Sequence, residues 1–426
     1  MAALVILAFV LDRPANILTG LQNIILMEDS LITDYIELAG IGAAFVNSAL
    51  VIGVSLLILW LVKDPLNGYT LVALGLMGGF SLFGKNIFNI WPIILGTFLY
   101  ARFRRESFTK YASVALLSTS LAPVVSFVCF SGDWTDFFIG ILLGVGIGFL
   151  LPSLSAYTYR IQNGMNLYNM GFACGLVAMM LVPVMTSMGR APTTAYYWAE
   201  GYNLILGIFM CSLCAIFIIA GLFFCHRPPW AAWAGYRHLL QARGRAPADF
   251  LRIYGAAPVL INMGINGLIG VIYILAIGGD LNGPTLGGIF TIIGFSAYGK
   301  HARNIIPVML GVVIGGLTMQ WNLYDSSVQL AGLFCTTLAP ISGYFGWPFG
   351  ILAGFLHSSV VLHAGTPVEG INLYNNGYSG GLIAIVLYPT ITAIVRHRRP
   401  VLQDEDYFDT FEHDEPIMPV SKSKKK

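Results

Sequence analysis

Long apolar stretches separated by short polar ones fill this chain almost from end to end. Fourteen such segments can be read from the sequence, and they predict helices buried in a membrane. Lipid leaves no water for backbone groups, so only helices or a closed barrel can cross it, and runs this long favour helices. The expected segments are Ala2–Leu11, Leu38–Val62, Tyr69–Phe83, Ile87–Phe103, Tyr111–Phe130, Phe137–Tyr157, Leu167–Met188, Tyr202–Cys225, Ile253–Gly278, Pro284–Tyr298, Asn304–Gln320, Val328–Tyr344, Trp347–His363 and Leu373–Val395.

Three of these segments are unusually short. Ala2–Leu11 has ten residues, which extend about 15 Å as a helix against about 30 Å of hydrocarbon. It lacks the basic start and small-residue cleavage site of a signal peptide. Tyr69–Phe83 and Pro284–Tyr298 have fifteen residues each. The sequence of these two segments is compatible both with a full span and with a re-entrant course.

The chain contains an internal duplication. Leu66–Thr70 recurs as Leu281–Thr285, and Gly79–Lys85 recurs as Gly294–Lys300, both 215 residues further on. Chance does not keep one offset over such a distance at polar and glycine positions, so the match indicates structural repeats. Further pairs at this offset are Pro14 and Pro229, Gly20 and Gly235, Asp34 and Asp249, Asn47 and Asn262, Asn89 and Asn304, Ile90 and Ile305, Pro92 and Pro307, and Gly96 and Gly311.

The duplication continues towards the end of each repeat. Leu121–Pro123 recurs as Leu338–Pro340, and the Asn-Leu-Tyr-Asn sequence of Asn166–Asn169 recurs as Asn372–Asn375 at an offset of 206. Each repeat therefore holds seven apolar segments.

The repeat boundaries follow from this match. We expect repeat 1 over residues 1–190, repeat 2 over 200–396, and a disordered cytoplasmic tail over 400–426. Ala2–Leu11 occupies the place that the much longer Tyr202–Cys225 takes in repeat 2. We therefore expect that the first span is truncated and that the natural start lies upstream of Met1.

An odd number of segments places the second repeat upside down relative to the first, the usual plan of secondary transporters. The charges test this independently. When the segments alternate in direction, 20 of the 23 basic residues fall on one face, and the other face has only Arg13, Lys85 and Arg190. The positive-inside rule makes the basic face cytoplasmic, with both termini inside. The expected fold class is thus an all-α polytopic membrane protein of two inverted repeats, with 12 to 14 spans.

Composition excludes several classes of protein. Hydrophobic residues make up 56% of the chain and charged residues 10%, against about 25% charged in soluble domains. The net charge of +2 indicates no nucleic-acid partner. Six scattered cysteines, including the Cys211/Cys214 pair inside an apolar run, predict neither a disulfide framework nor a zinc site. Without a phosphate-binding loop or a catalytic triad, we expect no enzyme, no cofactor and no metal.

Two stretches outside the spans predict helices at the membrane surface. Trp230, Trp233 and Tyr236 interleave with Arg237 and the arginines that follow, a pattern typical of an amphipathic helix on anionic lipid. The matching stretch of repeat 1, residues 16–26, is less charged and is expected on the outer face.

Lys85 and Lys300 are the first candidates for chemistry. Each ends a short glycine-rich segment, with Ser81 or Ser296 before it and Asn89 or Asn304 after it. If both segments are re-entrant, two ammonium groups enter from opposite sides and form a central site suited to an anion. The alternative is that both segments span fully and the lysines snorkel to opposite surfaces.

The doubled Asn-Leu-Tyr-Asn sequence is the second candidate. A helix that opens with such residues combines polar side chains with amides able to bind a carboxylate or phosphate. Helix capping and an interfacial tyrosine belt are the alternatives. The predicted solute-binding residues here are Asn166, Tyr168, Asn169, Asn372, Tyr374 and Asn375. The Gly171/Gly175 and Gly377/Gly381 spacings predict close helix packing instead.

Other polar residues in the apolar segments are fewer. Asn47 and Asn262 predict hydrogen bonds between helices, and His357 and His363 occur in repeat 2 only and predict structural roles rather than a proton relay. No Asp or Glu lies in the middle of any segment, although ion-coupled carriers usually bury one. Ion coupling therefore stays open.

The doubled Gly-Lys-x3-Asn-Ile-x-Pro motif at Gly84 and Gly299, with the doubled Asn-Leu-Tyr-Asn-x-Gly motif, resembles an uncharacterised bacterial membrane family, domain of unknown function 1576. The resemblance covers the chain to about Arg399 and implies a bacterial inner-membrane protein without a known activity. The seven-plus-seven plan is similar to the uracil-permease and sulfate-transporter architecture, and the short glycine-rich segments resemble those of urea transporters. These are similarities of architecture, since the sequence carries no diagnostic motif of either type.

These observations predict a secondary transporter with its site between the inverted repeats. The expected solute is a small polar organic molecule, either neutral or anionic. A channel-like facilitator of a small neutral solute is the first alternative, and a membrane enzyme or lipid-handling protein is an alternative of another class. The expected partners are the solute and the lipid bilayer; a homo-oligomer stays open.

Overall fold

A computed structural model describes residues 1–27, 33–190, 192, 196–225, 228–365 and 370–398. The predicted tail over 400–426 lies outside these residues. The described chain is all-α, with isolated β-bridges in place of strands. Repeat 1 contains α1 (Ala2–Leu11), α2 (Pro14–Leu26), α3 (Tyr35–Ala39), α4 (Ile41–Leu61), α5 (Gly68–Phe80), α6 (Trp91–Phe103), η1 (Phe108–Tyr111), α7 (Ala112–Ser118), η2 (Thr119–Leu121), α8 (Ala122–Phe130), α9 (Trp134–Ile161) and α10 (Asn169–Ser187).

The second half of the chain follows the same order of elements, without a counterpart of η1. It contains α11 (Asn203–Phe223), α12 (Pro229–Leu239), α13 (Phe250–Tyr254), α14 (Ala256–Ala276), α15 (Gly283–Phe295), α16 (Ala302–Thr318), α17 (Ser326–Phe334), η3 (Cys335–Leu338), α18 (Ala339–Phe345), α19 (Trp347–Ala364) and α20 (Asn375–Arg398).

The apolar pattern located the helices well. Each of the fourteen expected segments contains helix in the structure, and nine helices of the described chain are long and apolar enough to cross a membrane. Two of those nine, over 108–130 and 326–345, are interrupted by a 3-10 turn. The chain is therefore a multi-pass membrane protein, whereas the inverted orientation of its repeats stays a prediction.

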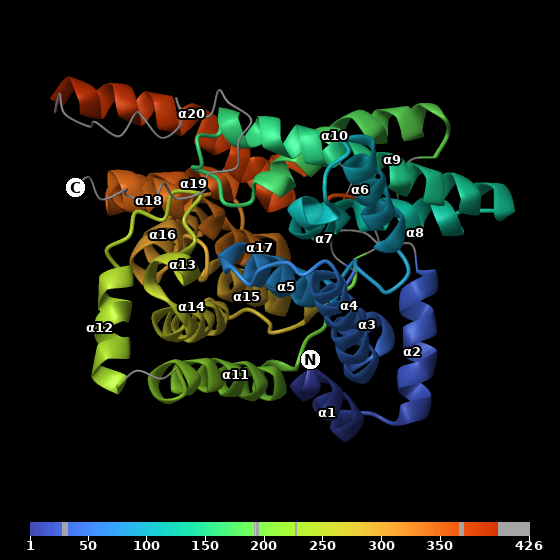
Figure 1. The fold of residues 1–426 in the computed structure, drawn as a ribbon, viewed down its shortest axis with the longest axis horizontal. Coiled ribbons are helices and arrows are strands. Elements are labelled where there is room, and N and C mark those ends of the chain that lie inside the picture. Colours follow the sequence, from blue (N-terminus) through green and yellow to red (C-terminus); the bar gives the residue numbers. More distant parts are fainter. Residues whose placement is uncertain (28–32, 191, 193–195, 226–227, 366–369, 399–426) are drawn as a thin grey trace, which may run out of the picture.

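The expected surface stretches are also helical. α2 and α12 lie at opposite edges of the molecule (Figure 1). α2 is bent 116° away from α1, so these two helices do not form one straight span.

The two halves meet through matching helices. α5 packs against α15 in the middle of the molecule, and α10 packs against α20 (Figure 1). Glycines allow this approach: a Cβ atom on Gly79 would lie 2.9 Å from the carbonyl oxygen of Gly287, and one on Gly377 would lie 2.7 Å from that of Tyr168. The predicted use of Gly171 and Gly377 for close packing is confirmed.

Candidate functional site

The two short helices end at matching turns that lead to the lysines. Gly84 and Gly299 take positive φ angles of 87° and 98°, a backbone region that glycine enters without strain. The chain then turns away from α5 or α15 at Lys85 or Lys300. A side chain larger than hydrogen at Gly84 would also overlap Leu373 of the other repeat.

An asparagine from the preceding long helix holds each turn. The side-chain amide of Asn47 donates to the carbonyl oxygens of Ser81 and Lys85, at 2.7 and 2.9 Å. Asn262 donates to the equivalent carbonyls of Ser296 and Lys300, at 2.8 and 2.7 Å. The predicted interhelical hydrogen bonds of these asparagines are confirmed, and they fix where each lysine leaves the backbone.

Both lysine side chains lie inside the protein. Lys85 and Lys300 are each 0% exposed, so the alternative of lysines that snorkel to opposite surfaces is wrong. The ammonium group of Lys85 donates to the Tyr374 hydroxyl at 2.5 Å and lies 3.6 Å from the Met77 sulfur. That of Lys300 donates to the Tyr168 hydroxyl, and to the Thr336 hydroxyl at 2.7 Å.

Aromatic rings surround each ammonium group. Lys85 Nζ lies 4.7 Å from the ring centroid of Tyr374 and 5.6 Å from that of Phe80. Lys300 Nζ lies 4.3 Å from the ring of Tyr168 and 5.1 Å from that of Phe295. Distances of this size permit cation–π attraction, which is strongest where water is excluded.

The lysine–tyrosine pairs cross between the repeats. Lys85 of repeat 1 binds Tyr374 of repeat 2, and Lys300 of repeat 2 binds Tyr168 of repeat 1. The structure thus brings together four of the residues predicted from the sequence, in two equivalent pairs that each join the turn after a short helix of one repeat to the residue before α10 or α20 of the other.

The backbone just before α10 and α20 is held by the opposite repeat. The Tyr168 amide donates to the Thr337 hydroxyl at 3.0 Å, and the Tyr374 amide donates to the Ser120 hydroxyl at 3.0 Å. Asn166 also accepts from the Thr337 hydroxyl. Both tyrosine amides are therefore engaged within the protein, whereas anion binding by the amides of the helix starts stays a prediction. The helices begin at Asn169 and Asn375, just beyond the tyrosines.

Asn166 and Asn372 connect the repeats rather than face the lysines. Their side-chain amides donate to the carbonyls of Gly377, at 3.0 Å, and of Gly171, at 3.3 Å. Each therefore ties the start of its own α10 or α20 to the other helix.

The remaining predicted residues hold local structure. Asn89 and Asn304 donate to the carbonyls of Gly84, at 3.1 Å, and of Gly299, at 2.8 Å. Both serines bond back to their own helices, and Asn169 bonds to Ser155 and Thr158 within repeat 1. The backbone amide of Asn375 donates to Asn372. None of these bonds reaches a lysine ammonium group.

A small internal cavity lies beside the tyrosines at the repeat interface. Its volume is about 20 Å³, which is room for about one water molecule. Its walls are largely equivalent residues from the two repeats: Leu76 and Thr291, Phe80 and Phe295, Leu167 and Leu373, Tyr168 and Tyr374, and Gly171 and Gly377. A solute larger than about one water molecule can enter only if the repeats move apart.

The cavity wall also differs between the repeats. Asn376 reaches the cavity from α20 and its side-chain oxygen lies 3.0 Å from Nε2 of His357, which is buried. The equivalent position of repeat 1 is Met170. His357 thus positions Asn376, consistent with the structural role expected for it.

No carboxylate balances the buried lysines in the part of the chain that the structure describes. The ion pairs there join Arg104 and Lys110 to Glu106, Arg190 to Asp136, and Arg252 to Asp249. The partners of Lys85 and Lys300 are hydroxyl groups, a sulfur atom and aromatic rings.

Sequence reasoning missed the hydroxyl residues that complete the site. Thr336 and Thr337 directly precede Leu338–Pro340, and Thr119 and Ser120 directly precede Leu121–Pro123. The repeated Leu-Ala-Pro was the signal that could have found them, because residues in register with a repeated motif come to equivalent places in both repeats.

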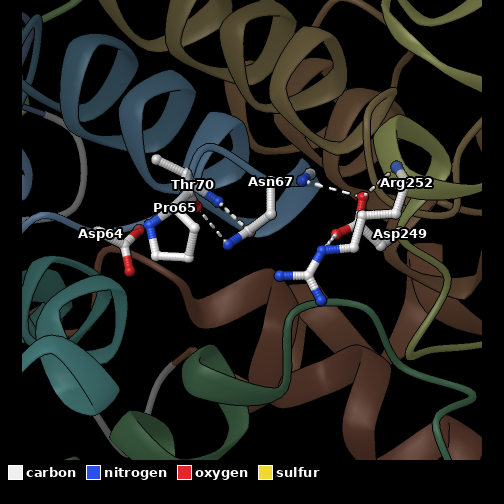
Figure 2. Close-up of polar contacts among 7 residues, drawn as sticks. Asp64, Pro65, Asn67, Thr70, Asp249 and Arg252 are labelled. Atoms are coloured by element: carbon white, nitrogen blue, oxygen red, sulfur yellow. Dashed lines mark hydrogen bonds and ion pairs between the residues drawn. The ribbon is translucent and has the colours of Figure 1, made fainter. Parts of the chain in front are cut away.

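Two acidic side chains also accept hydrogen bonds across the repeat interface, which the sequence did not predict. The Asp249 carboxylate accepts from the amide of Gly68, the first residue of α5, at 3.0 Å and pairs with Arg252 at 3.3 Å (Figure 2). The Asp34 carboxylate accepts from the amide of Gly283, the first residue of α15, at 3.2 Å. Each repeat thus caps the short helix of the other.

The fold and the site define a polytopic α-helical membrane protein with a centre of buried lysine, tyrosine and hydroxyl side chains between two related halves. The chain belongs to the family described as Protein of unknown function (DUF1576), whose model matches residues 13–187 and 229–393. This membership confirms the resemblance noted from the doubled motifs. No curated protein and no solved structure matches the chain.

Proposed function

We propose that this protein is a secondary transporter of a small polar organic solute, with small anions as the favoured class. The observation that carries the proposal is the pair of crossed contacts between Lys85 and Tyr374 and between Lys300 and Tyr168. The inner membrane, with both termini in the cytoplasm, is the proposed location.

The charge of the site favours an anion. An ionised group buried without an opposite charge is costly, and hydroxyl groups and aromatic rings offset only part of that cost. Lys85 and Lys300 have such neutral partners and no paired carboxylate among the described residues. A solute carboxylate or phosphate would supply the opposite charge, and it would compete with Tyr374 or Tyr168 for the ammonium group.

The doubling of the site supports alternating access. In an inverted-repeat transporter, equivalent halves exchange their conformations to open the centre to one side and then the other. Here the two lysine–tyrosine pairs would separate in turn. The small cavity between them fits this scheme, because a solute must open the interface in order to enter.

We further propose that α5 and α15 end within the membrane. Each has thirteen residues, about 20 Å at 1.5 Å per residue. α5 packs on α4 and α15, whereas α6 packs mainly on α9, so α5 and α6 diverge after the Lys85 turn. The re-entrant course in this proposal is thus an open bend rather than a closely packed hairpin.

Thermal unfolding of the purified protein tests the function. The panel would contain small mono- and dicarboxylates, inorganic phosphate and sulfate, with urea and uracil as neutral comparators. At 100 times its Kd, a ligand of the folded state adds about 2.7 kcal/mol of stability. We expect saturable stabilisation by an anion, lost in Lys85→Gln and in Lys300→Gln but kept in Lys110→Gln, whose side chain is 55% exposed. The anion found would then be tested for counterflow in proteoliposomes.

Several outcomes would contradict the proposal. Stabilisation that survives in both buried-lysine variants would place the solute elsewhere. Dependence on Lys85 alone or Lys300 alone would favour a membrane enzyme with one active half. Stabilisation by urea or uracil alone would favour the neutral-solute facilitator.

A further inference from the structure

The crossed caps at Asp34 and Asp249 are equivalent in position but differ in environment. Both side chains accept hydrogen bonds from their own short helix, α3 or α13, and from the first amide of the opposite repeat's α15 or α5. They occupy matching positions 215 residues apart. A difference between them therefore shows where the two repeats have diverged at this cap.

The difference lies three residues after each aspartate. Asp249 is followed by Arg252, which pairs with it at 3.3 Å, and the Asp249 side chain is 19% exposed. At the position equivalent to Arg252, repeat 1 has Glu37. Asp34 itself is 0% exposed, and no ion pair to it exists among the described residues.

Three backbone amides converge on Asp34. Its Oδ1 accepts from Ile36 at 2.9 Å and from Gly283 at 3.2 Å, and its Oδ2 accepts from Ala199 at 3.0 Å. The carboxylate therefore joins the start of α3, the start of α15 and the segment before α11. These contacts bridge both repeats.

The ionisable groups on the elements around Asp34 are mostly acidic. They are Tyr35 and Glu37 on its own element, Tyr197 and Glu200 on the segment before α11, Asp280 before α15, and Lys85 on the segment that follows Phe83, with which Asp34 forms a β-bridge. The ammonium group of Lys85 is directed to Tyr374 instead. Burial raises the pKa of Asp34 to about 7, with Glu37 adding to the rise and the three amide bonds opposing it.

We propose that Asp34 is the proton-binding site of this protein, and that proton binding there loosens the crossed cap on α15 and so couples proton movement to solute movement. This inference rests on the transport function proposed above. The site belongs to repeat 1 only, because Arg252 holds Asp249 in an ion pair.

The mechanism follows from the geometry of the carboxylate. When a proton from solution binds one carboxylate oxygen, that oxygen becomes an O–H donor and keeps less capacity to accept. The bond from either Gly283 or Ala199 then weakens. α15 leads directly into the turn at Lys300, so a looser start of α15 gives the second lysine–tyrosine pair freedom to separate.

Hydrogen exchange with mass spectrometry tests this without knowledge of the solute. The peptide that contains the α15 start, Gly283–Leu286, is compared with the peptide that contains the α5 start in the same molecule. The α5 start is capped by Asp249 and serves as the internal reference. We take the ratio of the exchange rate at the α15 start to that at the α5 start, because the intrinsic pH dependence of exchange is common to both and cancels. Between pH 6 and pH 8 the protonated fraction of a group with pKa near 7 falls about tenfold, and we expect the ratio to fall by a similar factor.

Matched variants complete the experiment. Asp34→Asn should make the ratio independent of pH and leave it at the high value that wild type shows at low pH. Asp249→Asn should leave the pH dependence in place. Infrared difference spectra between pH 6 and pH 8 should show a protonated-carboxyl band that Asp34→Asn removes. This second readout uses the ionisation of wild-type protein and does not depend on the fold of one variant.

The possible results separate the two proposals. A ratio independent of pH in wild type, or a carboxyl band that persists in Asp34→Asn, overturns the proton site even if an anion stabilises the protein through both lysines. If Asp34 titrates as proposed but stabilisation by a solute does not depend on Lys85 and Lys300, the proposed solute site is overturned instead. In the proteoliposomes, uptake of the anion should acidify or alkalinise the interior in wild type but not in Asp34→Asn.

Discussion

Tyr374 accepts a hydrogen bond at 2.5 Å from the ammonium group of Lys85, which lies 289 residues earlier in the chain. The equivalent Tyr168 accepts one from Lys300. Two buried lysine side chains are therefore held by the opposite half of the molecule. Any motion that separates the turn after α5 from the start of α20, or the turn after α15 from the start of α10, must strain or break these contacts.

The Lys85–Tyr374 contact should contribute measurably to the stability of the folded protein. Hydrogen bonds to charged groups contribute about 1.5 to 3 kcal/mol. A double-mutant cycle of Lys85→Met and Tyr374→Phe, followed by reversible unfolding in mixed micelles, should give a coupling energy in that range. Tyr157→Phe is the control, because Tyr157 is exposed, and it should change stability by under about 0.5 kcal/mol. A coupling energy near zero would show that the pair does not form.

Replacement of Gly377 should force α10 and α20 apart. A Cβ atom there would lie 2.7 Å from the Tyr168 carbonyl oxygen, and overpacking of this kind costs about 1 to 3 kcal/mol. Gly146→Ala in α9 is the matched control, since a Cβ atom there meets nothing within 4 Å, and it should be neutral or stabilising. Equal unfolding free energies for Gly377→Ala and wild type would contradict the close approach.

The two turn-holding asparagines should differ in importance. Asn47→Ala leaves the carbonyls of Ser81 and Lys85 without their side-chain donor, at a cost of about 1 to 3 kcal/mol. In repeat 2, Asn266 lies 3.4 Å from the Lys300 carbonyl and can partly replace Asn262, whereas the equivalent of Asn266 in repeat 1 is Val51. Unfolding measurements should therefore show Asn47→Ala to be the more destabilising variant. The reverse order would refute this reading of the asymmetry.

Stability should depend on pH through Asp34. Its pKa is raised from 3.8 to about 7 in the folded protein, so the folded state binds the proton more tightly than the unfolded chain. The resulting stabilisation is fully present below about pH 4 and is lost as the pH rises through about 7. Unfolding free energies measured from pH 4 to pH 8 should fall for wild type and for Asp249→Asn, and should fall less steeply for Asp34→Asn. Parallel curves for wild type and Asp34→Asn would exclude this group as the cause.

Much of the architecture could be predicted because apolar run length is a strong signal in membrane proteins. Helices occur in all fourteen expected segments, and α2 and α12 form where the amphipathic stretches predicted them. The starts of α10 and α20 were placed slightly too early, because the residues before them are as compatible with a helix as with the turn observed at Leu167–Tyr168 and Leu373–Tyr374. The bonds from Thr337 and Ser120 decide that turn, and they come from the other repeat.

The sequence could predict which residues form the candidate site, but not which of them contact each other. Repetition singled out Lys85, Lys300, Tyr168 and Tyr374, and it carried no information on which lysine meets which tyrosine. Asp34 was overlooked for a related reason. It lies outside the apolar segments, so a search for carboxylates in the middle of a span passes over it, although its burial comes from the fold.

An all-helical membrane protein with a duplicated plan can be read from the chain alone, since run length, composition and a constant offset are properties of the sequence. The packing of the helices settles the rest: each lysine is bound by the opposite repeat, the Tyr168 and Tyr374 amides are engaged there, and Asp34 is buried while Asp249 is paired with Arg252. The physical reason is that burial and hydrogen-bond partners depend on residues hundreds of positions apart, and glycine-lined helix contacts set those distances.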